Sequence, residues 1–523
     1  MFEQALRSGL ERRPGAFRWI GRSALDARPL TERQGAADYV ADVLETAHDP
    51  RESMTHQAER TGNEDAGARQ PLERFFARVS DDPLADAFAG AGTVHPFVGM
   101  TPVPDADVAE VWHRVMETPR AAPGVAYVHV PFCENHCLFC GFYQNPWRSD
   151  AGAAYVDAVL KHLEKDAGRA CLQGPPLRAV YLGGGTPTTL AASDVARLVE
   201  GLRRALPLAG DCEITLEGRV VSFDGEKARA AFDAGVNRLS IGIQSFDDGI
   251  RRSMGRKAGK AEVIRFLEDL VRADRAAVIV DLIYGLPGQS LEDFAADVGL
   301  AADLGLDGFD LYALNLISRA PLASAIARGK HRPVPRQDLG RYYAAGSAVA
   351  ARAGFEPITT SHWRRGARER NLYNAAIKSG ADCLAYGAGG GAFLAGHSFR
   401  HTADLSDYEK RAGTDACLAA GMVRMSPLAP VHNAVKAGME EGFLDPVEPT
   451  QYLAGLGGGD FVALTAPLLG QWCEAGLMER SGRVYCLTLA GRFWQVAMTG
   501  RLLAWLEEEA GPSLRAPAPQ SPS

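Results

Sequence analysis

From about residue 125 onward, short apolar runs alternate with amphipathic stretches. The apolar runs have the length and the Val, Ile and aromatic content of buried strands, and they lie at 126–130, 178–184, 212–218, 238–244, 276–287 and 308–314. Helical periodicity fills the intervals, as in 193–206, in 261–274 and in a segment that begins near Ala153. This alternation predicts an α/β fold with a parallel sheet, either open or closed into a barrel.

The six predicted strands are fewer than the eight of a full TIM barrel. We therefore predict a partial, TIM-like (β/α)6 barrel. In parallel sheets the chemistry is carried by loops at the C-terminal ends of the strands. The loop after the first strand, residues 131–145, is thus the first place to expect a site.

The C-terminal part of the chain follows a different pattern. Helical stretches lead into QWCEAGLMERSGRVYCLTLAGRFW at 471–494. A helix, a glycine turn, a short strand and then LT-x-x-G-RFW resemble a winged-helix unit. Winged helices often bind DNA, but this region has few basic residues, so we predict a mostly helical, winged-helix-like cap that packs on the core or covers a substrate.

The sequence composition also indicates how the chain is divided, beginning with a polar segment near the N-terminus. Residues 49–71 are polar and poor in branched apolar residues, which is typical of a disordered linker. Met54 opens this linker and is an alternative start of the protein. The predicted parts are a largely disordered extension over 1–90, a barrel core over 91–320, a substrate region over 321–415, the cap over 416–510 and a disordered tail over 511–523.

Composition excludes several functions. The 523 residues are 46% hydrophobic and 23% charged, as in a soluble globular protein. A net charge of −8 argues against binding driven by phosphate contacts. No apolar run reaches the roughly 18–20 residues that span a bilayer, and the N-terminus lacks a signal peptide's apolar centre. We expect a cytoplasmic location, reduced thiols, and neither a nucleic-acid nor a membrane partner.

Three of the nine cysteines lie in HVPFCENHCLFCGFYQN at 129–145, as Cys133, Cys137 and Cys140. Thiolates at such short spacing hold zinc or an iron–sulfur cluster. A structural zinc site has four ligands, but no fourth cysteine is near and His136 is not at a usual ligand spacing. A 4Fe–4S cluster on three thiolates keeps one iron open for a substrate's amino and carboxylate groups. The alternatives are three buried free cysteines, or zinc completed by a distant ligand.

The C-x3-C-x2-C pattern after a first strand, with aromatic Phe139 before the last cysteine, resembles the radical S-adenosylmethionine (SAM) superfamily. The resemblance implies a 4Fe–4S cluster on these cysteines, with SAM on the open iron. One electron then cleaves a carbon–sulfur bond of SAM and yields a 5′-deoxyadenosyl radical.

Further motifs narrow the family. They are YVHVPFC (127–133), YLGGGTPT (181–188), EITLEG (213–218), GVNRLSIGIQSF (235–246), MGRK (254–257) and DLIYGLPGQ (281–289), and they resemble the oxygen-independent coproporphyrinogen III dehydrogenase-like group. The resemblance implies that Tyr127 and Arg256 take part in catalysis. It implies that cofactor is bound by Tyr127, Phe139, Gly183, Gly184, Gly185, Thr186, Glu217, Gln244, Arg256, Asp281 and Ala313.

The residues themselves allow simpler interpretations. Glycine-rich turns after strands are common, so GGGTPT alone is a weak indication. Glu217, at the end of an apolar strand, could be a buried partner of Arg238. The cofactor assignment agrees with chemistry, because carboxylates and amides accept from an amine and ribose while a guanidinium pairs with a carboxylate.

Phe142 stands where the coproporphyrinogen enzymes carry a further cysteine. With CGFYQN (140–145) and the segment 362–393, it makes the chain resemble the haem-utilisation branch of the group. That resemblance implies a radical SAM methyltransferase that uses two SAM molecules and opens haem without oxygen. Its product is a linear tetrapyrrole of the anaerobilin type, with release of iron.

Such a reaction requires a flat slot for the macrocycle. Cations for the propionates could come from Arg364, Arg365, Arg368 and Arg370, although such a run can also be a solvated helix face. The glycines of GAGGG (387–391) allow close approach of backbone to haem or to the second SAM, or form a structural turn. His362, His397 and His401 could bind haem iron, but single histidines are more often structural.

Two other functions compete with haem opening. One is a haem chaperone of the same group, and the other is a radical SAM methyltransferase or cyclopropanase that acts on a heteroaromatic natural product. The enzyme interpretation needs an external electron donor such as flavodoxin, because the sequence has no flavin motif of its own.

Overall fold

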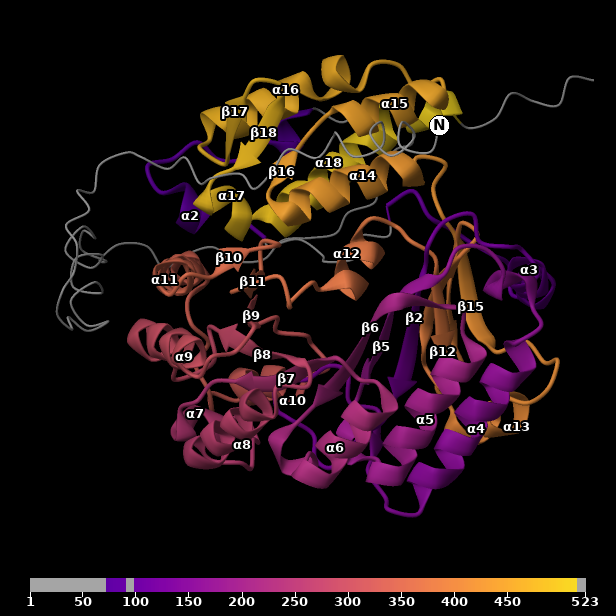
Figure 1. Ribbon diagram of the computed structural model, residues 1–523. Coiled ribbons are helices and arrows are strands. Elements are labelled where there is room, and N and C mark those ends of the chain that lie inside the picture. The colour runs from indigo at the N-terminus through magenta and orange to yellow at the C-terminus, as the bar shows by residue number, and fades with distance from the viewer. Residues whose placement is uncertain (1–71, 91–97, 515–523) are drawn as a thin grey trace, which may run out of the picture. The chain divides into compact units, whose positions relative to one another are not determined.

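The computed structural model describes residues 72–90 and 98–514 (Figure 1). The chain divides into two units, 1–53 and 54–523, and all described residues belong to the second. No helix within the two described ranges combines the length and the apolar character needed to cross a bilayer.

A sheet of 13 strands organises this unit, and seven neighbouring strands at its centre run parallel. In sheet order these are β12 (Cys383–Tyr386), β2 (Val125–Val130), β5 (Leu177–Gly184), β6 (Leu208–Gly218), β7 (Arg238–Gln244), β8 (Ala277–Tyr284) and β9 (Gly308–Ala313). The six strands expected from the sequence are all present. The seventh, β12, was not expected, and it comes from the region assigned to the substrate.

Antiparallel strands continue the sheet on both sides of this centre. Beyond β12 come β13 (Gly391–Leu394), β14 (His397–His401), β15 (Ala419–Arg424) and β1 (Thr101–Pro102), and beyond β9 come β11 (His362–Arg364) and β10 (Glu356–Pro357). Because β1 and β10 do not pair with each other, the described sheet does not close. The expectation of a partial barrel is therefore confirmed.

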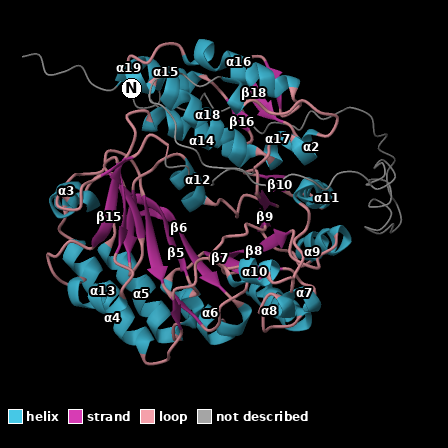
Figure 2. Ribbon diagram, turned by 180° about the vertical axis from the view of Figure 1, so that it is seen from behind, coloured by secondary structure: helices cyan, strands magenta, loops and turns pink. Residues whose placement is uncertain are grey.

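Helices cover the outer face of the parallel strands (Figures 1 and 2). They include α4 (Ala151–Asp166), α5 (Ala192–Ala205), α6 (Gly225–Ala234), α7 (Asp248–Ser253), α8 (Lys260–Ala273), α9 (Leu291–Asp303) and α11 (Leu339–Arg352). Local signals fix where these helices begin and end: Ser290 and Asp293 form a capping box at the start of α9, and Gly235, at φ +118°, ends α6.

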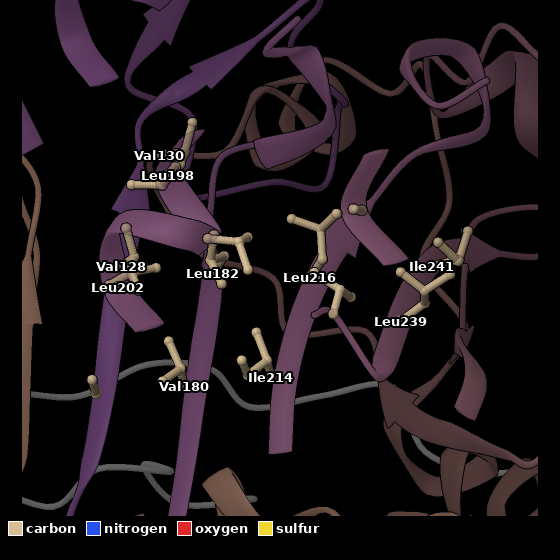
Figure 3. Close-up of a cluster of buried hydrophobic side chains, with 14 of the residues drawn as sticks. Val128, Val130, Val180, Leu182, Leu198, Leu202, Ile214, Leu216, Leu239 and Ile241 are labelled. Atoms are coloured by element: carbon tan, nitrogen blue, oxygen red, sulfur yellow. The ribbon is translucent and has the colours of Figure 1, made fainter. Parts of the chain in front are cut away.

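Alternate residues of each strand point outward and form the main core. Val180, Leu182, Ile214 and Leu216 lie in this layer, with Leu198 of α5 packed nearby (Figure 3). Burying each such side chain contributes about 1.5–3 kcal/mol. The intervening residues point inward. Many of them are polar or aromatic, and these are Tyr127, His129, Tyr181, Glu213, Thr215, Glu217, Arg238, Ser240, Asp281, Asp310 and Tyr312. The inner face is therefore the place for polar chemistry.

The C-terminal region has its own core. It consists of α14 (Ala429–Glu441), β16 (Phe443–Leu444), α15 (Val447–Gly455), α16 (Phe461–Glu474), β17 (Met478–Ser481), β18 (Val484–Leu487), α17 (Leu489–Phe493) and α18 (Gln495–Glu509). The three short strands form a separate antiparallel sheet in the order β16-β18-β17. Helices followed by a hairpin are the arrangement predicted for a winged-helix-like cap.

Two expectations about the ends of the chain are corrected. Residues 72–90, assigned to a largely disordered extension, form short helices and pack into the C-terminal core through Phe75 and Phe88. Aromatic side chains buried against tryptophans give this segment a fixed place. At the other end, α19 (Gly511–Leu514) is helical, although the tail was expected to be disordered from 511.

The remaining predictions about the ends lie outside the described residues. These concern the polar linker 49–71, the alternative start at Met54, the rest of the extension up to residue 71, and the tail from residue 515.

Short α12 (Leu372–Lys378) lies between the C-terminal region and the parallel strands (Figures 1 and 2). Its Leu372, Tyr373 and Ile377 pack against Val125 and Cys383, which stand at the N-terminal ends of β2 and β12. Helix α12 therefore closes the barrel interior at the end opposite the cysteine loop.

Candidate active site

The three clustered cysteines follow the C-terminal end of β2. Cys133 belongs to β3 (Phe132–Cys133), which pairs in parallel with β4 (Asn145–Pro146) and so holds the two ends of the loop together. A turn between the other two thiols is closed by the Cys140 amide, which donates to the Cys137 carbonyl at 3.1 Å. Cys133 and Cys137 are buried, and Cys140 is half-buried.

Each of the three sulfurs lies beside a hydrogen-bond donor. The Thr186 hydroxyl is 3.3 Å from the Cys133 sulfur, and the Phe142 amide donates to the Cys140 sulfur at 3.3 Å. The Arg256 guanidinium donates to the Cys137 sulfur at 3.5 Å. Donors of this kind favour thiolates, which are the form that binds metals.

Buried cations surround the sulfurs. Arg256 also donates to the Gly242 carbonyl, which fixes its guanidinium beside the loop. Arg219 donates to the backbone and side-chain oxygens of Asn135. Burial raises the pKa values of Cys133 and Cys140, whereas Arg219 lowers both. Sequence reasoning missed Arg219, although its place directly after β6 was an available indication.

The glycine turn after β5 lies directly against the cysteine loop. Gly185 and Thr186 donate backbone hydrogen bonds to the carbonyls of Val130 and Phe132 at 2.8 and 2.7 Å. A Cβ on Gly185 would meet those same carbonyl oxygens at 2.7 and 2.6 Å, and one on Gly184, at φ +103°, would meet the His129 ring at 2.4 Å. Glycine is therefore required here so that the two loops can touch.

Glu217 lies beside this turn. Its carboxylate accepts from the Tyr181 hydroxyl at 2.7 Å and from the Gly184 amide at 3.2 Å, and a Cβ on Gly183 would collide with it. Burial raises the pKa of Glu217. The interpretation of Glu217 as the ion-pair partner of Arg238 is wrong, because Arg238 donates to Glu369 at 3.0 Å.

Gln244 has two unusual properties. Its backbone adopts a left-handed conformation, with φ +67°, where β7 is irregular. Its side-chain oxygen is buried and has no hydrogen-bond partner among the described residues. Backbone strain and an unpaired buried acceptor cluster at ligand sites, so this amide oxygen is placed to accept from a bound molecule.

Asp281 stands on the inner face of β8. The Ser240 hydroxyl lies 3.3 Å from its carboxylate. Burial, with the nearby carboxylates Asp310 and Glu217, raises the pKa of Asp281 to about 7. Ala313, the last residue of β9, is exposed and pairs in register with Tyr284.

The chain matches a model of the radical SAM superfamily over residues 127–301. It is 42% identical to the anaerobilin synthase of Escherichia coli O157:H7 over 428 residues, which cover 81% of this chain and 93% of that protein. The chain belongs to the anaerobilin synthase family of the radical SAM superfamily.

Two further relatives are more distant. The haem chaperone HemW of Lactococcus lactis is 28% identical, over 56% of this chain and 76% of its own length. In fold, this radical SAM protein is similar to the coproporphyrinogen III oxidase HemN of Escherichia coli, with a TM-score of 0.62, 21% identity, and coverage of 75% of this chain and 92% of that one.

The residues of this radical SAM chain fit a 4Fe–4S cluster. Three thiols with donors, beside two buried cations, match the cluster that the family requires.

Two of the expected cofactor residues, Tyr127 and Phe139, pack mainly against aromatic or apolar side chains. The Tyr127 hydroxyl lies 3.0 Å from His129 Nδ1, and the Tyr127 ring packs with Tyr181 and Tyr373. Tyr127 thus occupies the middle of β2, before the cysteine loop. Phe139 packs in an apolar cluster with the helices on either side of the loop, α7 and α10 (Pro321–Ala327).

The segment before α12 forms the floor of the radical SAM barrel. Glu369, fully buried, accepts from Arg238 and contacts His362 at 3.0 Å. The Leu372 amide donates to Glu213 at 2.9 Å, and Tyr373 packs on Tyr181 with ring centroids 4.7 Å apart. The sequence alone assigned no role to Glu369 or Tyr373.

Three of the four arginines expected to bind propionates are already engaged. Arg368 pairs with Asp274, Arg370 donates to the Asp211 carbonyl, and Arg365 donates to the carbonyls of Ala302 and Ala353. They stand near the N-terminal ends of the strands, the end opposite the cysteines. Their pairing and place favour a structural role.

The histidines that were candidates for binding haem iron are buried or contact other protein groups. His362 lies 2.8 Å from Asp310 at Nδ1 and 3.0 Å from Glu369 at Nε2, so both ring nitrogens face carboxylates. His401 is 2% exposed, and burial lowers its pKa to about 3. The His397 ring lies 2.9 Å from its neighbour's carbonyl, that of Ala395.

The GAGGG turn lies close to the cysteine loop. The amides of Gly387 and Ala388 donate to the hydroxyls of Tyr408 and Tyr155 at 3.0 Å each. A Cβ on Gly389, at φ +79°, would meet the Gln144 side chain at 3.1 Å. The turn is thus a structural one that also brings backbone to the edge of the site.

Proposed function

We propose that this chain is a radical SAM C-methyltransferase that opens the haem macrocycle without oxygen, gives a linear tetrapyrrole of the anaerobilin type and releases iron. The observation that carries the proposal is the 42% identity to an anaerobilin synthase over 93% of that protein's length. The haem chaperones are less similar and match a smaller part of the chain.

The chain's residues have separate tasks in this proposal. Cys133, Cys137 and Cys140 hold the cluster, and Arg219 and Arg256 balance its negative charge. When bound, the cluster supplies one electron that cleaves a carbon–sulfur bond of SAM and provides a carbon-centred radical.

Polar groups on the inner face hold SAM in this proposal. In it, Glu217 and the backbone of the glycine turn (Gly183–Thr186) accept from the amine, and Gln244 contributes its unpaired oxygen. Asp281 binds the ribose and Ala313 contacts the adenine. Two cofactor molecules are needed if one supplies the radical and another the methyl group, and the GAGGG turn is the place for the second.

The reaction also needs one electron from outside the chain. We propose a separate one-electron carrier such as flavodoxin in the cytoplasm. The region 321–415 completes the substrate site from both sides, because it contributes the floor before α12 and the GAGGG turn near the cysteines.

An anaerobic assay tests the function. Protein with its cluster restored is mixed with haem, reductant and SAM labelled in the methyl group. Loss of haem absorbance, release of 5′-deoxyadenosine and a labelled open tetrapyrrole in the mass spectrum are expected. Haem that is bound but unchanged would instead identify a chaperone.

Matched cysteine variants locate the cluster. Replacing Cys133, Cys137 and Cys140 together by Ala should remove bound iron and all SAM cleavage. Cys417→Ala, which changes a half-buried thiol outside the loop, should leave both unchanged. Cleavage by the triple variant would show that the cluster lies elsewhere.

A further inference from the structure

The Tyr312 side chain is partly accessible to solvent, although protein atoms surround its phenol. It is the next-to-last residue of β9, and 40% of it is accessible to solvent. Yet burial, with the neighbouring carboxylates Asp310 and Asp281, raises the pKa of its phenol well above the usual value. A side chain combines these properties when it lines an internal space. Tyr312 therefore borders the interior of the barrel.

The sheet register places Tyr312 beside the proposed SAM residues. It pairs with Ile283, two residues beyond the pair formed by Asp281 and Asp310, and Ala313 follows it. Side chains two residues apart on a strand share a face, so the phenol lies on the same side as Asp310. A molecule held by the SAM residues would have the Tyr312 hydroxyl as a neighbour.

A buried chain of charged groups leads away from this phenol. Asp310 Oδ1 lies 2.8 Å from His362 Nδ1, His362 Nε2 lies 3.0 Å from Glu369 Oε1, and Arg238 Nε donates to Glu369 at 3.0 Å. All four residues are at most 4% exposed. Burial alone would lower the pKa of His362, but the two carboxylates outweigh it and raise the pKa to about 9. The ring therefore holds a proton at neutral pH.

We propose that Tyr312 is the hydrogen-atom donor that ends the radical stage of the reaction, with Asp310, His362 and Glu369 as its positioning residues. The proposal rests on the proposed function, which leaves a carbon radical on the substrate. The phenolic O–H bond breaks, a C–H bond forms, and the unpaired electron moves to the tyrosine oxygen. One electron from the external carrier and one proton from the Asp310–His362 pair then restore the phenol.

Charge favours a hydrogen atom over a bare proton. Loss of a proton would create a phenolate beside Asp310 and Asp281, in a space where burial already penalises charge. Loss of a hydrogen atom leaves the side chain neutral. The Tyr312 phenol hydrogen-bonds with Asp310, and the contact of Asp310 with His362 at 2.8 Å holds that carboxylate in place.

The hydroxyls of the other tyrosines around the barrel interior contact other groups. The Tyr181 hydroxyl donates to Glu217 at 2.7 Å, and the Tyr127 hydroxyl is 3.0 Å from His129. The Tyr373 hydroxyl lies 3.9 Å from the Cys383 sulfur, in the floor of the barrel. Tyr312 combines accessibility with a connected proton source.

Tyr312→Phe tests the role with the full-length protein loaded with its cluster. SAM cleavage should continue, while formation of the open tetrapyrrole falls by roughly 10²-fold, a loss typical of a missing positioned proton donor. A substrate radical should accumulate in the electron paramagnetic resonance spectrum. In D2O, the wild type should add one deuterium to the product carbon. An unchanged ratio of tetrapyrrole to 5′-deoxyadenosine in the variant would overturn the proposal.

A measurement without turnover tests the position of the phenol. Protein labelled with 3-fluorotyrosine is titrated with ferric haem in the absence of SAM and reductant. Because ferric iron is paramagnetic, the Tyr312 fluorine signal, assigned by its loss in Tyr312→Phe, should broaden. The signal of Tyr284, which packs against Phe294, should not. A Tyr312 signal that haem leaves sharp would overturn the proposal.

Two controls distinguish a failure of the proposed role of Tyr312 from a failure of the proposed haem-opening function. Tyr284→Phe removes a hydroxyl from the outer layer and should keep the wild-type product ratio. If the wild type itself consumes no haem, the proposed function fails. If it consumes haem and Tyr312→Phe does so equally well, only the role of Tyr312 fails.

Discussion

Single residues in this barrel accept strain where a ligand is expected. Gln244 holds a left-handed backbone and an unpaired buried amide oxygen, each of which costs free energy in the protein without ligand. Such unfavourable geometry is retained when the binding of a ligand offsets its free-energy cost. Gln244 is therefore the residue of the inner face whose geometry points most directly to a ligand.

Gln244→Gly should separate the two costs. Glycine adopts φ +67° without strain, so the free energy of unfolding should stay equal or rise by up to about 1 kcal/mol. SAM affinity should fall by about tenfold, the value of one hydrogen bond of ~1.4 kcal/mol. Urea unfolding and equilibrium dialysis measure the two effects. Ala395→Gly is the matched control, since Ala395 also has positive φ, at +45°, but lies in the β13–β14 turn.

At the scale of elements, one buried ion chain ties the segment before α12 to the parallel sheet. Arg238 begins β7, Glu369 precedes α12, and His362 belongs to β11. Glu369→Gln should lower the free energy of unfolding by about 3–5 kcal/mol, because the buried Arg238 keeps its charge but loses its hydrogen-bonded carboxylate. Asp274→Asn, which breaks the exposed pair with Arg368, should cost less than about 1 kcal/mol.

The same chain makes stability depend on pH in the alkaline range. The folded pKa of His362, about 9, exceeds its ordinary value of 6.5, so its contribution is complete below pH 6.5 and is lost as pH rises through 9. A shift of this size corresponds to about 3 kcal/mol. The urea midpoint of the wild type should therefore fall between these pH values. That of His362→Gln should stay level, and a parallel fall in both would assign the effect to other groups.

Local patterns were sufficient to predict the barrel, because a strand buried between layers needs a continuous apolar run. They failed for β12, which has four residues within a glycine-rich segment and exists because it pairs with β2. They found the cysteines and the glycine turn, whose spacing is local. They did not find Glu369 as the partner of Arg238, since 131 residues separate them and only the tertiary fold brings them together.

At the scale of the molecule, the two largest apolar cores of the described residues lie behind the barrel and in the C-terminal region, and Phe493 packs against both. Polar contacts at the barrel floor link them, including the Thr360 amide, which donates to the Glu440 carbonyl at 2.8 Å, and the ion pair of Lys378 with Glu440. Residues 72–90 belong to the second core, far along the chain from its other members. We therefore expect the C-terminal region to unfold in a transition of its own.

Phe88→Ala tests this division. The Phe88 ring is 6% exposed, meets Trp494 edge-on at 5.7 Å and lies under the Arg501 guanidinium at 4.1 Å. Its loss should cost about 3–5 kcal/mol in the C-terminal core alone. Calorimetry should show one transition moving to lower temperature while the barrel transition and the iron content stay unchanged. Leu198→Ala, in the barrel core, should move only the other transition, and a common shift by either variant would show that the two cores unfold as one.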